Sequence, residues 1–239
     1  MSGQVKPIKE KDVTFIQGVK DCIPTLIGYI SIGIAAGVVG ASSNLSIAEV
    51  TILSALVYAG ASQFIICALL ASASPISAII LTTFIVNFRH LLLSMTVAPT
   101  FTIYSSIKNI GFGILLTDET FGVASTKIAN RQYINDKWMN GLNVTAYVSW
   151  IISCMLGAIF GKWISNPEPF GLDFSLTAMF VALLILQLQH QKHSKLKLYL
   201  SLIVYVVLFM IILSMLMPSY IAILISTIIG ATIGVIQDK

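Results

Sequence analysis

Residues Ile110–Thr126 read IGFGILLTDETFGVAST, and this stretch decides how many times the chain crosses a membrane. The run has the length of a membrane span, but Asp118 and Glu119 lie in its middle. Two interpretations follow. Either the segment crosses the bilayer with both acids at membrane depth, or it is a re-entrant loop that returns to the side from which it came.

The composition around this stretch is that of an integral membrane protein. Of 239 residues, 56% are hydrophobic and 10% are charged, and the mean hydropathy is +0.90. Soluble domains carry about 25% charged residues, so this chain lacks the polar groups to cover a surface in water. The net charge of +4 therefore bears on membrane orientation rather than on nucleic-acid binding.

Seven further apolar segments are long enough to cross a bilayer. With segment 106–127 they predict an all-α, polytopic transmembrane helical bundle of about eight membrane segments, and the alternative is seven segments plus a re-entrant one. A single transport domain then occupies residues 23–239, after a cytoplasmic, amphipathic N-terminal segment at 1–22 that lies as a short helix on the membrane surface. The seven segments are 23–41, 48–72, 75–98, 139–162, 173–190, 198–217 and 219–237.

Basic residues decide between the two topologies. With eight crossings and a cytoplasmic N-terminus, the basic clusters at 127–137 and 192–197 lie inside the cell, as the positive-inside rule requires. One re-entrant segment at 106–127 would place both clusters outside. We therefore predict eight crossings, with both termini on the cytoplasmic side. Trp138 and Trp163 flank segment 139–162 and are expected at the two membrane interfaces.

The chain has a possible internal repeat of four segments, over residues 23–127 and 139–237. Gly33-x-x-x-Gly37 and Gly157-x-x-x-Gly161 lie 124 residues apart and occupy matching places in the two halves. Close packing of helix backbones is the simpler interpretation of both motifs. Repeats of this kind are nevertheless typical of secondary transporters, whose substrate site lies at the bilayer midplane where the halves meet.

Two apolar segments carry polar stripes that lipid does not tolerate, so both stripes are expected to face other helices or a cavity. Segment 48–72 opens with Ser46 and Glu49, whose spacing indicates a capping box. Near its centre, Gly60 precedes Ser62 and Gln63, which offer hydrogen bonds either to another helix or to a substrate. The stripes are Thr51, Ser54, Tyr58 and Ser62, and then Thr83, Asn87, His90 and Ser94.

Arg89 lies well inside the apolar run of segment 75–98. An arginine at the centre of a membrane helix costs about 2.5 to 3.5 kcal/mol on insertion scales, so a partner is expected. Asp118 and Glu119 are the other acid pair at membrane depth, and we predict that Arg89 faces one of them. The pair either locks two helices together or marks a functional site. His90 is either a hydrogen-bonded packing residue or a carrier of a coupling proton.

The sequence does not favour an enzyme or a metal site. The three cysteines, Cys22, Cys67 and Cys154, lie far apart, and no His-Glu-x-x-His motif or P-loop occurs. No metal, cofactor or ATPase activity is therefore predicted. The run Gly60-Ala61-Ser62 is similar to the serine motif of rhomboid proteases, with His90 as a conceivable base, but Gln63 replaces its final glycine. Intramembrane proteolysis stays a remote alternative.

Four motifs together resemble the AzlC family, the large subunits of bacterial branched-chain amino acid exporters. The resemblance covers about residues 14–130 through its motifs and continues more weakly to about 235. Phe88 stands where many members have leucine or a similar residue. The motifs are Asp21-Cys22-Ile23-Pro24, Ala59-Gly60-Ala61-Ser62-Gln63-Phe64, Asn87-Phe88-Arg89-His90 and Leu116-Thr117-Asp118-Glu119-Thr120-Phe121.

The resemblance implies a secondary carrier in the bacterial plasma membrane. Its implied activity is the export of leucine, isoleucine and valine, and in some members methionine, together with a small membrane partner of the AzlD type. The alternatives are a structural subunit of a membrane transport complex and a carrier of another small amphipathic solute. The candidate substrate-binding residues are Tyr58, Gly60, Ala61, Ser62, Gln63, Asn87 and Arg89, and the candidate proton-coupling residues are Asp118, Glu119 and His90.

Overall fold

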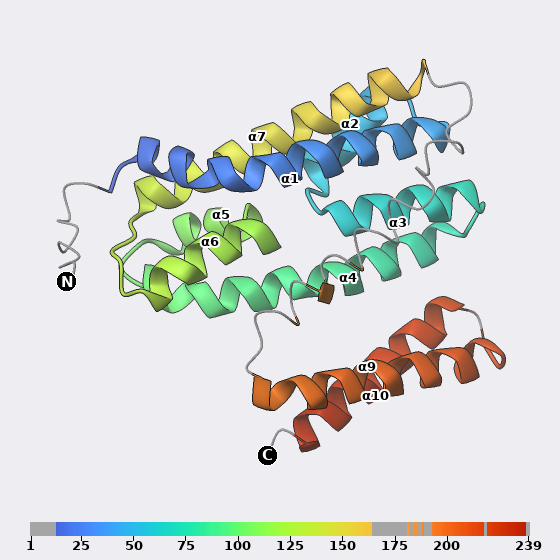
Figure 1. Cartoon of the computed structure of the whole chain (residues 1–239). Coiled ribbons are helices and arrows are strands. Elements are labelled where there is room, and N and C mark those ends of the chain that lie inside the picture. The colour runs from blue at the N-terminus through green and yellow to red at the C-terminus, as the bar shows by residue number, and fades with distance from the viewer. Residues whose placement is uncertain are drawn as a thin grey trace.

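The computed structural model describes residues 13–163, 193–217 and 219–237, together with single positions at 181, 184, 185 and 188. Every regular element in this part of the chain is a helix, which confirms the all-α membrane bundle (Figure 1). The elements are α1 (Phe15–Ser42), α2 (Ile47–Leu56), α3 (Gly60–Ala71), α4 (Ile76–Val97), the 3-10 turn η2 (Ala98–Phe101), α5 (Ser106–Ile114), α6 (Asp118–Ala129), α7 (Asp136–Gly161), α9 (His193–Ser214) and α10 (Ser219–Gln237).

Four of the described helices are long and apolar enough to cross a membrane. They are α1, α4 with its 3-10 extension, α7 and the apolar part of α9. The 28 residues of α1 and the 26 residues of α7 rise about 42 and 39 Å, which exceeds the hydrocarbon thickness of a bilayer. The predicted segment 173–190 lies almost wholly outside the described residues.

Glycines let α1 and α7 pack backbone against backbone along their whole length. A Cβ on Gly37 would lie 2.1 Å from the carbonyl oxygen of Cys154, and one on Gly18 would lie 2.1 Å from that of Trp138. Gly157 meets α1 in the same way. These pairs keep a constant register, so the two helices run parallel and form one frame. The close-packing interpretation of the two glycine motifs is thereby confirmed, while the internal repeat stays a prediction.

Segment 48–72 is a hairpin of two short helices rather than one crossing helix. α2 and α3 have 10 and 12 residues, so each rises about half the thickness of the hydrocarbon core. Between them, Tyr58 takes a left-handed backbone conformation with φ of 42°, which breaks the helix. α3 then returns to the end of α1, where the Cys67 thiol lies beside the Ser43 side chain.

Segment 106–127 is a second hairpin, built from the 9 residues of α5 and the 12 residues of α6. It starts beside the first turn of α7, where Lys108 Nζ lies 2.7 Å from Asp136 Oδ2. It ends beside the first turns of α1, where Lys127 Nζ lies 2.9 Å from Asp21 Oδ2. The chain therefore enters and leaves on one side, as the re-entrant alternative proposed.

The two hairpins enter the bundle from opposite sides. The mouth of α2–α3 lies where α1 ends, and the mouth of α5–α6 lies where α1 and α7 begin (Figure 1). The prediction that segments 48–72 and 106–127 each cross the membrane is corrected accordingly. The physical reason for the first segment is that α2 and α3 are as apolar as crossing helices, so hydropathy does not separate them. In the second segment, the acids at the start of α6 mark the break.

Two smaller expectations concern the end of the bundle where the chain begins. α1 runs without a break from Phe15 through Pro24, so residues 15–22 belong to the first long helix rather than to a separate surface helix. Trp138, in the first turn of α7, is fully buried within the protein, and its indole Nε1 donates a hydrogen bond to Asp21 Oδ2 at 2.8 Å. Trp163 is exposed, as an interfacial residue would be.

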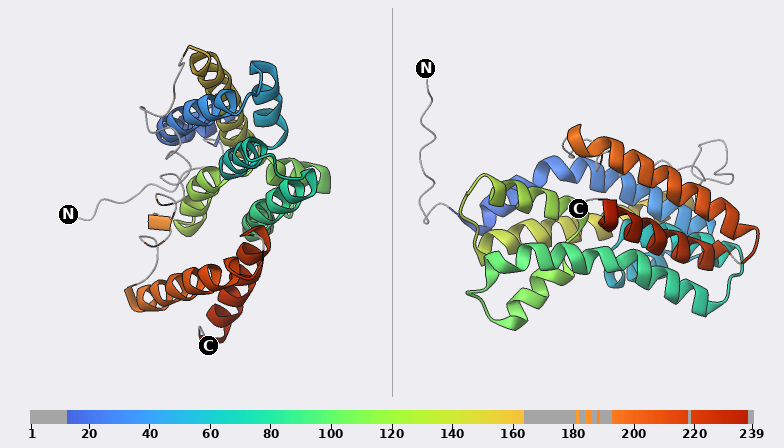
Figure 2. Two further views of the ribbon diagram at one scale, coloured as in Figure 1. Left: turned by 90° about the vertical axis from the view of Figure 1, so that its right-hand side faces the viewer. Right: turned by 90° about the horizontal axis from the view of Figure 1, so that it is seen from below.

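The helices α9 and α10 form a pair that stands beside α4 and apart from the α1–α7 frame (Figure 2). They pack closely, because a Cβ on Gly230 would lie 2.2 Å from Val206 Cγ2. The hydrogen bonds and the ion pair described at the two hairpin tips come from α1, α4 and α7. The functional site is therefore sought in the first part of the chain.

Candidate functional site

The broken ends of the two hairpins meet around Tyr29, halfway along α1. The Tyr29 hydroxyl is hydrogen-bonded to the Thr117 hydroxyl and donates to Glu119 Oε2 at 3.2 Å, both at the α5–α6 tip. On its other side lies the hydroxyl of Tyr58, from the α2–α3 tip. Tyr29 is 4% exposed and Tyr58 is 6% exposed. One buried residue thus joins two hairpins that enter from opposite sides.

The α2–α3 tip is held to α7 by neutral hydrogen bonds. The Tyr147 hydroxyl donates to the carbonyl oxygen of Ala55 at 2.9 Å, and the Trp150 indole donates to Gln63 Oε1 at 2.8 Å. The ring of Tyr58 stacks edge-on against Tyr147. No side chain caps the first turn of α3, whose N-cap residue is Ala59. The backbone N–H groups of that turn form the positive end of a half-helix near the middle of the bundle.

The α5–α6 tip carries the charges. Thr117 caps α6, and Asp118 and Glu119 occupy its first turn, where negative charge is favoured. Asp118 Oδ2 lies 2.9 Å from Nη2 of Arg89 in α4, and about a quarter of each side chain is exposed. The predicted pairing of Arg89 with an intramembrane acid is therefore confirmed, and Asp118 is the partner.

The polar stripe of α4 contacts both hairpins. Ser62 Oγ donates to Asn87 Oδ1 at 2.5 Å on the α2–α3 side. On the α5–α6 side, His90 Nδ1 lies 3.1 Å from the carbonyl oxygen of Leu116, and Ser94 Oγ donates to that of Gly113 at 3.3 Å. Asn87, His90 and Ser94 of this stripe therefore face other helices, as predicted. The bonds of Ser62 and His90 go to other residues, so the geometry gives no support to a serine–histidine catalytic pair.

The structure brings most of the predicted site residues together at the two tips. Tyr58, Gly60, Ala61, Ser62 and Gln63 lie at or just after the α2–α3 break. Asn87, Arg89 and His90 reach across from α4, and Asp118 and Glu119 open α6. The stripe of segment 48–72 does not continue as predicted, because its helix breaks.

Before that break, Thr51 and Ser54 bond to carbonyl groups of their own helix. At the mouth of the same hairpin, the Ser46–Glu49 capping box is present, as predicted.

Sequence reasoning missed Tyr29, Thr117 and Trp150, which connect the tips to the frame. Tyr29 and Trp150 lie edge-on with ring centroids 5.6 Å apart, so one aromatic contact spans the α1–α7 seam. A single tyrosine in an apolar span carries little signal, because its hydroxyl only shows a role once a partner is known. Thr117 could have been identified from the sequence, because Thr117 and Thr120 have the spacing of a capping box at the start of an acidic helical turn.

Several polar atoms at the tips lack a partner. Among the described residues, the buried Tyr58 hydroxyl, His90 Nε2 and Arg89 Nε have none at hydrogen-bond distance. Buried polar atoms are nearly always satisfied, by protein, water or a bound solute. These three atoms therefore mark places where water or a solute is expected at the tips.

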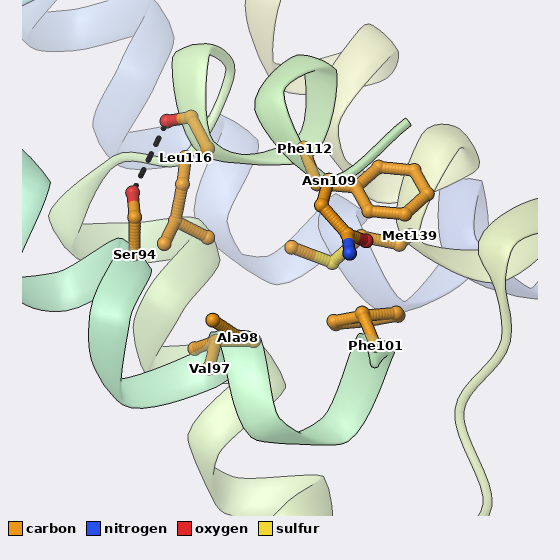
Figure 3. A pocket seen from close by; sticks show the side chains of 9 residues that line it. Ser94, Val97, Ala98, Phe101, Asn109, Phe112, Leu116 and Met139 are labelled. Atoms are coloured by element: carbon orange, nitrogen blue, oxygen red, sulfur yellow. Dashed lines mark hydrogen bonds between the residues drawn. The ribbon is translucent and has the colours of Figure 1, made fainter. Parts of the chain in front are cut away.

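A cavity of about 40 Å³ lies beneath the α5–α6 tip (Figure 3). Val97, Ala98 and Phe101 wall it on one side, and Asn109 and Phe112 face them from α5, with Met139 behind. This volume holds a few water molecules but no amino acid. This cavity is therefore too small for an amino acid, and we expect the hairpins to move apart when a larger solute binds there.

Half-helices whose ends meet inside a membrane bundle, with charged and polar groups at the break, define a class of protein. In this class, membrane transport proteins, discontinuous helices present their termini to a solute near the midplane. The comparisons with known proteins identify the member of the class more closely.

The family model described as AzlC protein matches residues 24–164, a range that contains both hairpins. The inner membrane protein YgaZ of Escherichia coli (strain K12) is 30% identical over 184 residues, which cover 75% of each chain. The branched-chain amino acid transport protein AzlC of Bacillus subtilis (strain 168) is 28% identical over 174 residues, or 72% of this chain and 67% of the relative. No solved structure matches. The chain belongs to the AzlC family.

Proposed function

We propose that this chain is a secondary carrier that exports leucine, isoleucine, valine and methionine from a bacterial cell in exchange for protons. The observation that carries the proposal is the meeting of two hairpin tips around Arg89, Asp118 and Glu119. The name of the Bacillus subtilis relative supports the substrate class. As the resemblance to the family implies, we propose that a small membrane subunit of the AzlD type works with the chain.

The chemistry of the tips fits a zwitterion with an apolar side chain. The uncapped first turn of α3, with Gly60, Ala61 and Ser62, offers N–H groups to the carboxylate of the amino acid. The acids of α6 offer negative charge to its ammonium group. Aliphatic side chains of the surrounding helices supply the rest of the pocket once the hairpins separate.

The individual roles follow from this placement. We propose that Tyr58, Gly60, Ala61, Ser62, Gln63, Asn87 and Arg89 shape the substrate site, and that Asp118, Glu119 and His90 form the group of candidates for the coupling proton. His90 bonds to the backbone of the α5–α6 tip, so a change in its charge acts directly on that hairpin.

Efflux from cells tests the function. Cells that co-express the chain with its small partner are loaded with leucine, and release is measured with and without a protonophore. We expect faster release than from cells with the partner alone, and a large loss of that excess when the proton gradient collapses. Release that equals the control would favour a structural subunit, and release of a different solute would favour the other carrier alternative.

For orientation, we propose that both termini lie in the cytoplasm, as the basic residues indicate. The two hairpins together leave the side of every later segment unchanged, because each returns the chain to where it entered. They also move Lys108 to the side that holds the clusters at 127–137 and 192–197, which strengthens the positive-inside pattern. A plasma-membrane protein with this orientation has the α5–α6 mouth inside the cell.

Cysteine labelling tests the orientation. The three native cysteines are buried, so a new one at an exposed position dominates the reaction with a membrane-impermeant reagent. We expect Ser106→Cys at the exposed start of α5 to react in inverted vesicles and not in intact cells. Lys162→Cys, at the far end of α7, should show the reverse. Labelling of Ser106→Cys from outside would contradict the proposed orientation.

A further inference from the structure

The two acids at the start of α6 have different surroundings. Asp118 is paired with Arg89 at 2.9 Å, so its charge is already balanced. The ion pairs among the described residues leave Glu119 without a cation. Glu119 instead accepts a hydrogen bond from Tyr29 at 3.2 Å. An acid inside a membrane bundle needs a proton or another cation, since an isolated charge is costly there.

A buried hydroxyl without a partner lies next to this acid. Tyr58 is 6% exposed, its hydroxyl has no partner at hydrogen-bond distance, and it lies near both Glu119 and the Tyr29 hydroxyl. One carboxylate and two phenolic oxygens therefore lie near one another between the hairpin tips. They come from Glu119 at the start of α6, Tyr29 of α1 and Tyr58 between α2 and α3. The ring of Trp150 lies edge-on against Tyr29, and the ring of Tyr147 lies edge-on against Tyr58, so both tyrosines are held in place by α7.

We propose that Glu119, Tyr29 and Tyr58 bind the α-ammonium group of the transported amino acid, and that the same carboxylate carries the coupling proton when the site is empty. The inference rests on the proposed function and deepens it. An ammonium group donates three hydrogen bonds, and this cluster offers three oxygen acceptors. The arrangement assigns to Asp118 a different task, which is to neutralise Arg89.

A single carboxylate that holds either a proton or an ammonium group couples their movements. When the amino acid arrives from the cytoplasm, Glu119 loses its proton and accepts the ammonium group. When the amino acid leaves on the outer side, the carboxylate takes up a proton there. One proton therefore enters for each zwitterion exported, and the site never returns empty and charged.

Other charged and titratable groups surround the cluster, and they could add their own pH dependence to binding. Arg89 and His90 face it from α4, and Asp118 precedes Glu119 on α6. Cys22 of α1 and Tyr147 of α7 lie near Tyr58. The variants below leave four of these five residues unchanged. The fifth, Asp118, is substituted as a control.

Leucine binding at different pH values tests the inference. The full chain with its small partner is purified in detergent, and the Kd of radiolabelled leucine is measured between pH 5 and 9. Because protons compete for the same carboxylate, we expect wild-type affinity to fall as the pH falls, by up to about tenfold per pH unit. In Glu119→Gln we expect binding at least tenfold weaker and independent of pH.

Two controls separate the site from general damage. Glu49→Gln makes the same chemical change in an exposed capping box, where glutamine caps equally well, and should bind as wild type does. Asp118→Asn should lower the yield of folded protein, because Arg89 loses its partner, but the folded fraction should keep the pH dependence. A pH dependence lost in Asp118→Asn and kept in Glu119→Gln would overturn the assignment.

A leucine analogue without the amino group tests the ammonium contact directly. Wild type should prefer leucine over 4-methylpentanoate at least tenfold, and Glu119→Gln should lose most of this preference. Tyr58→Phe removes a hydroxyl that lies near the Tyr29 hydroxyl but has no group within hydrogen-bond distance, so it should fold normally and weaken leucine binding about threefold to tenfold with the pH dependence intact. Tyr58→Phe that binds as wild type would exclude Tyr58 from the site.

Failure of the inference and failure of the proposed function are distinguishable. If wild type binds and exports leucine and Glu119→Gln does so with the same affinity and pH dependence, only this inference is wrong. If wild type neither binds nor exports leucine or its relatives, the proposed function is wrong and the ammonium site falls with it.

Discussion

The two hairpins have similar lengths and meet at the same residue, but they are held in place by different forces. Neutral hydrogen bonds fix α2–α3, through Ser62 to Asn87, Trp150 to Gln63 and Tyr147 to the Ala55 carbonyl. Ion pairs contribute to holding α5–α6. Arg89–Asp118 lies at its tip, and Lys127–Asp21 and Lys108–Asp136 lie at its mouth; these are the three ion pairs among the described residues.

This difference indicates which hairpin responds to a solute. A proton or a charged solute can replace a partner in an ion pair, or can bind the Glu119 carboxylate, which has no cation among the described residues. Either event changes the charge balance around α6. The hydrogen bonds that hold α2–α3 are between neutral groups, so a change of charge does not break them directly. We therefore expect α2–α3 to act as a fixed wall and α5–α6 to be the element whose position depends on what is bound.

The largest effect is expected where both hairpins lose their common support. Gly157→Ala would place a Cβ 2.1 Å from the carbonyl oxygen of Ile34, and neither backbone can yield without separating α1 from α7. We expect a loss of at least about 3 kcal/mol in the free energy of unfolding and little folded protein in the membrane. Size-exclusion chromatography of the detergent extract measures the folded fraction.

Gly122→Ala is the matched control, because nothing lies within 4 Å of the added Cβ on α6. In a helix without crowding, alanine is more favourable than glycine by about 0.5 to 1 kcal/mol, so this variant should be slightly more stable. Equal stability losses in the two variants would show that the α1–α7 seam is not the common support of the hairpins.

The charged hairpin should be the more sensitive to loss of one contact. Arg89→Ala leaves Asp118 without its cation inside the bundle, and we expect a loss of about 3 kcal/mol in stability together with loss of transport. The double variant Arg89→Ala with Asp118→Ala should recover part of the folded protein. Thermal unfolding of the purified variants gives the comparison, and additive losses in the double variant would mean that the two residues act independently.

The mouth of the charged hairpin should show a smaller effect of the same kind. Lys127 bridges α6 to Asp21 of α1 at 2.9 Å and also lies over the ring of Trp138. Lys127→Met keeps the aliphatic stem and removes the charge, so we expect a loss of about 1 to 2 kcal/mol. A double-mutant cycle with Asp21→Asn should give a coupling above about 0.5 kcal/mol. A coupling of zero would show that the mouth is held by packing alone.

Sequence alone predicted the contents of the site better than its shape. The polar stripe of α4 and Arg89 had to face partners, because lipid does not solvate them, and Asn87, His90, Ser94 and Arg89 do. The two hairpins were not predicted together, because α2 and α3 are both apolar and the break at Tyr58 has no proline and no run of polar residues. Asp118 and Glu119 marked the other break and prompted the re-entrant alternative.

The orientation predicted from charge does not depend on how the two segments fold. Two re-entrant hairpins on opposite sides cancel, so the positive-inside rule assigns the same side to residues 127–137 whether both segments cross or both return. The burial of Trp138 was not predicted, because its acceptor Asp21 is far away in the sequence. Contacts between such distant residues leave no local pattern in the sequence.

The smallest expected effect concerns a side chain of the neutral hairpin. Ser62 Oγ already donates to Asn87 at 2.5 Å, so the substrate is expected to meet the backbone of this turn rather than the hydroxyl. Ser62→Ala should therefore lower stability by about 1 kcal/mol and leave the Kd for leucine within about twofold of wild type. Unfolding and binding are measured on the same preparation. A tenfold weaker affinity with unchanged stability would show that the Ser62 hydroxyl, and not only the backbone of this turn, contacts the substrate.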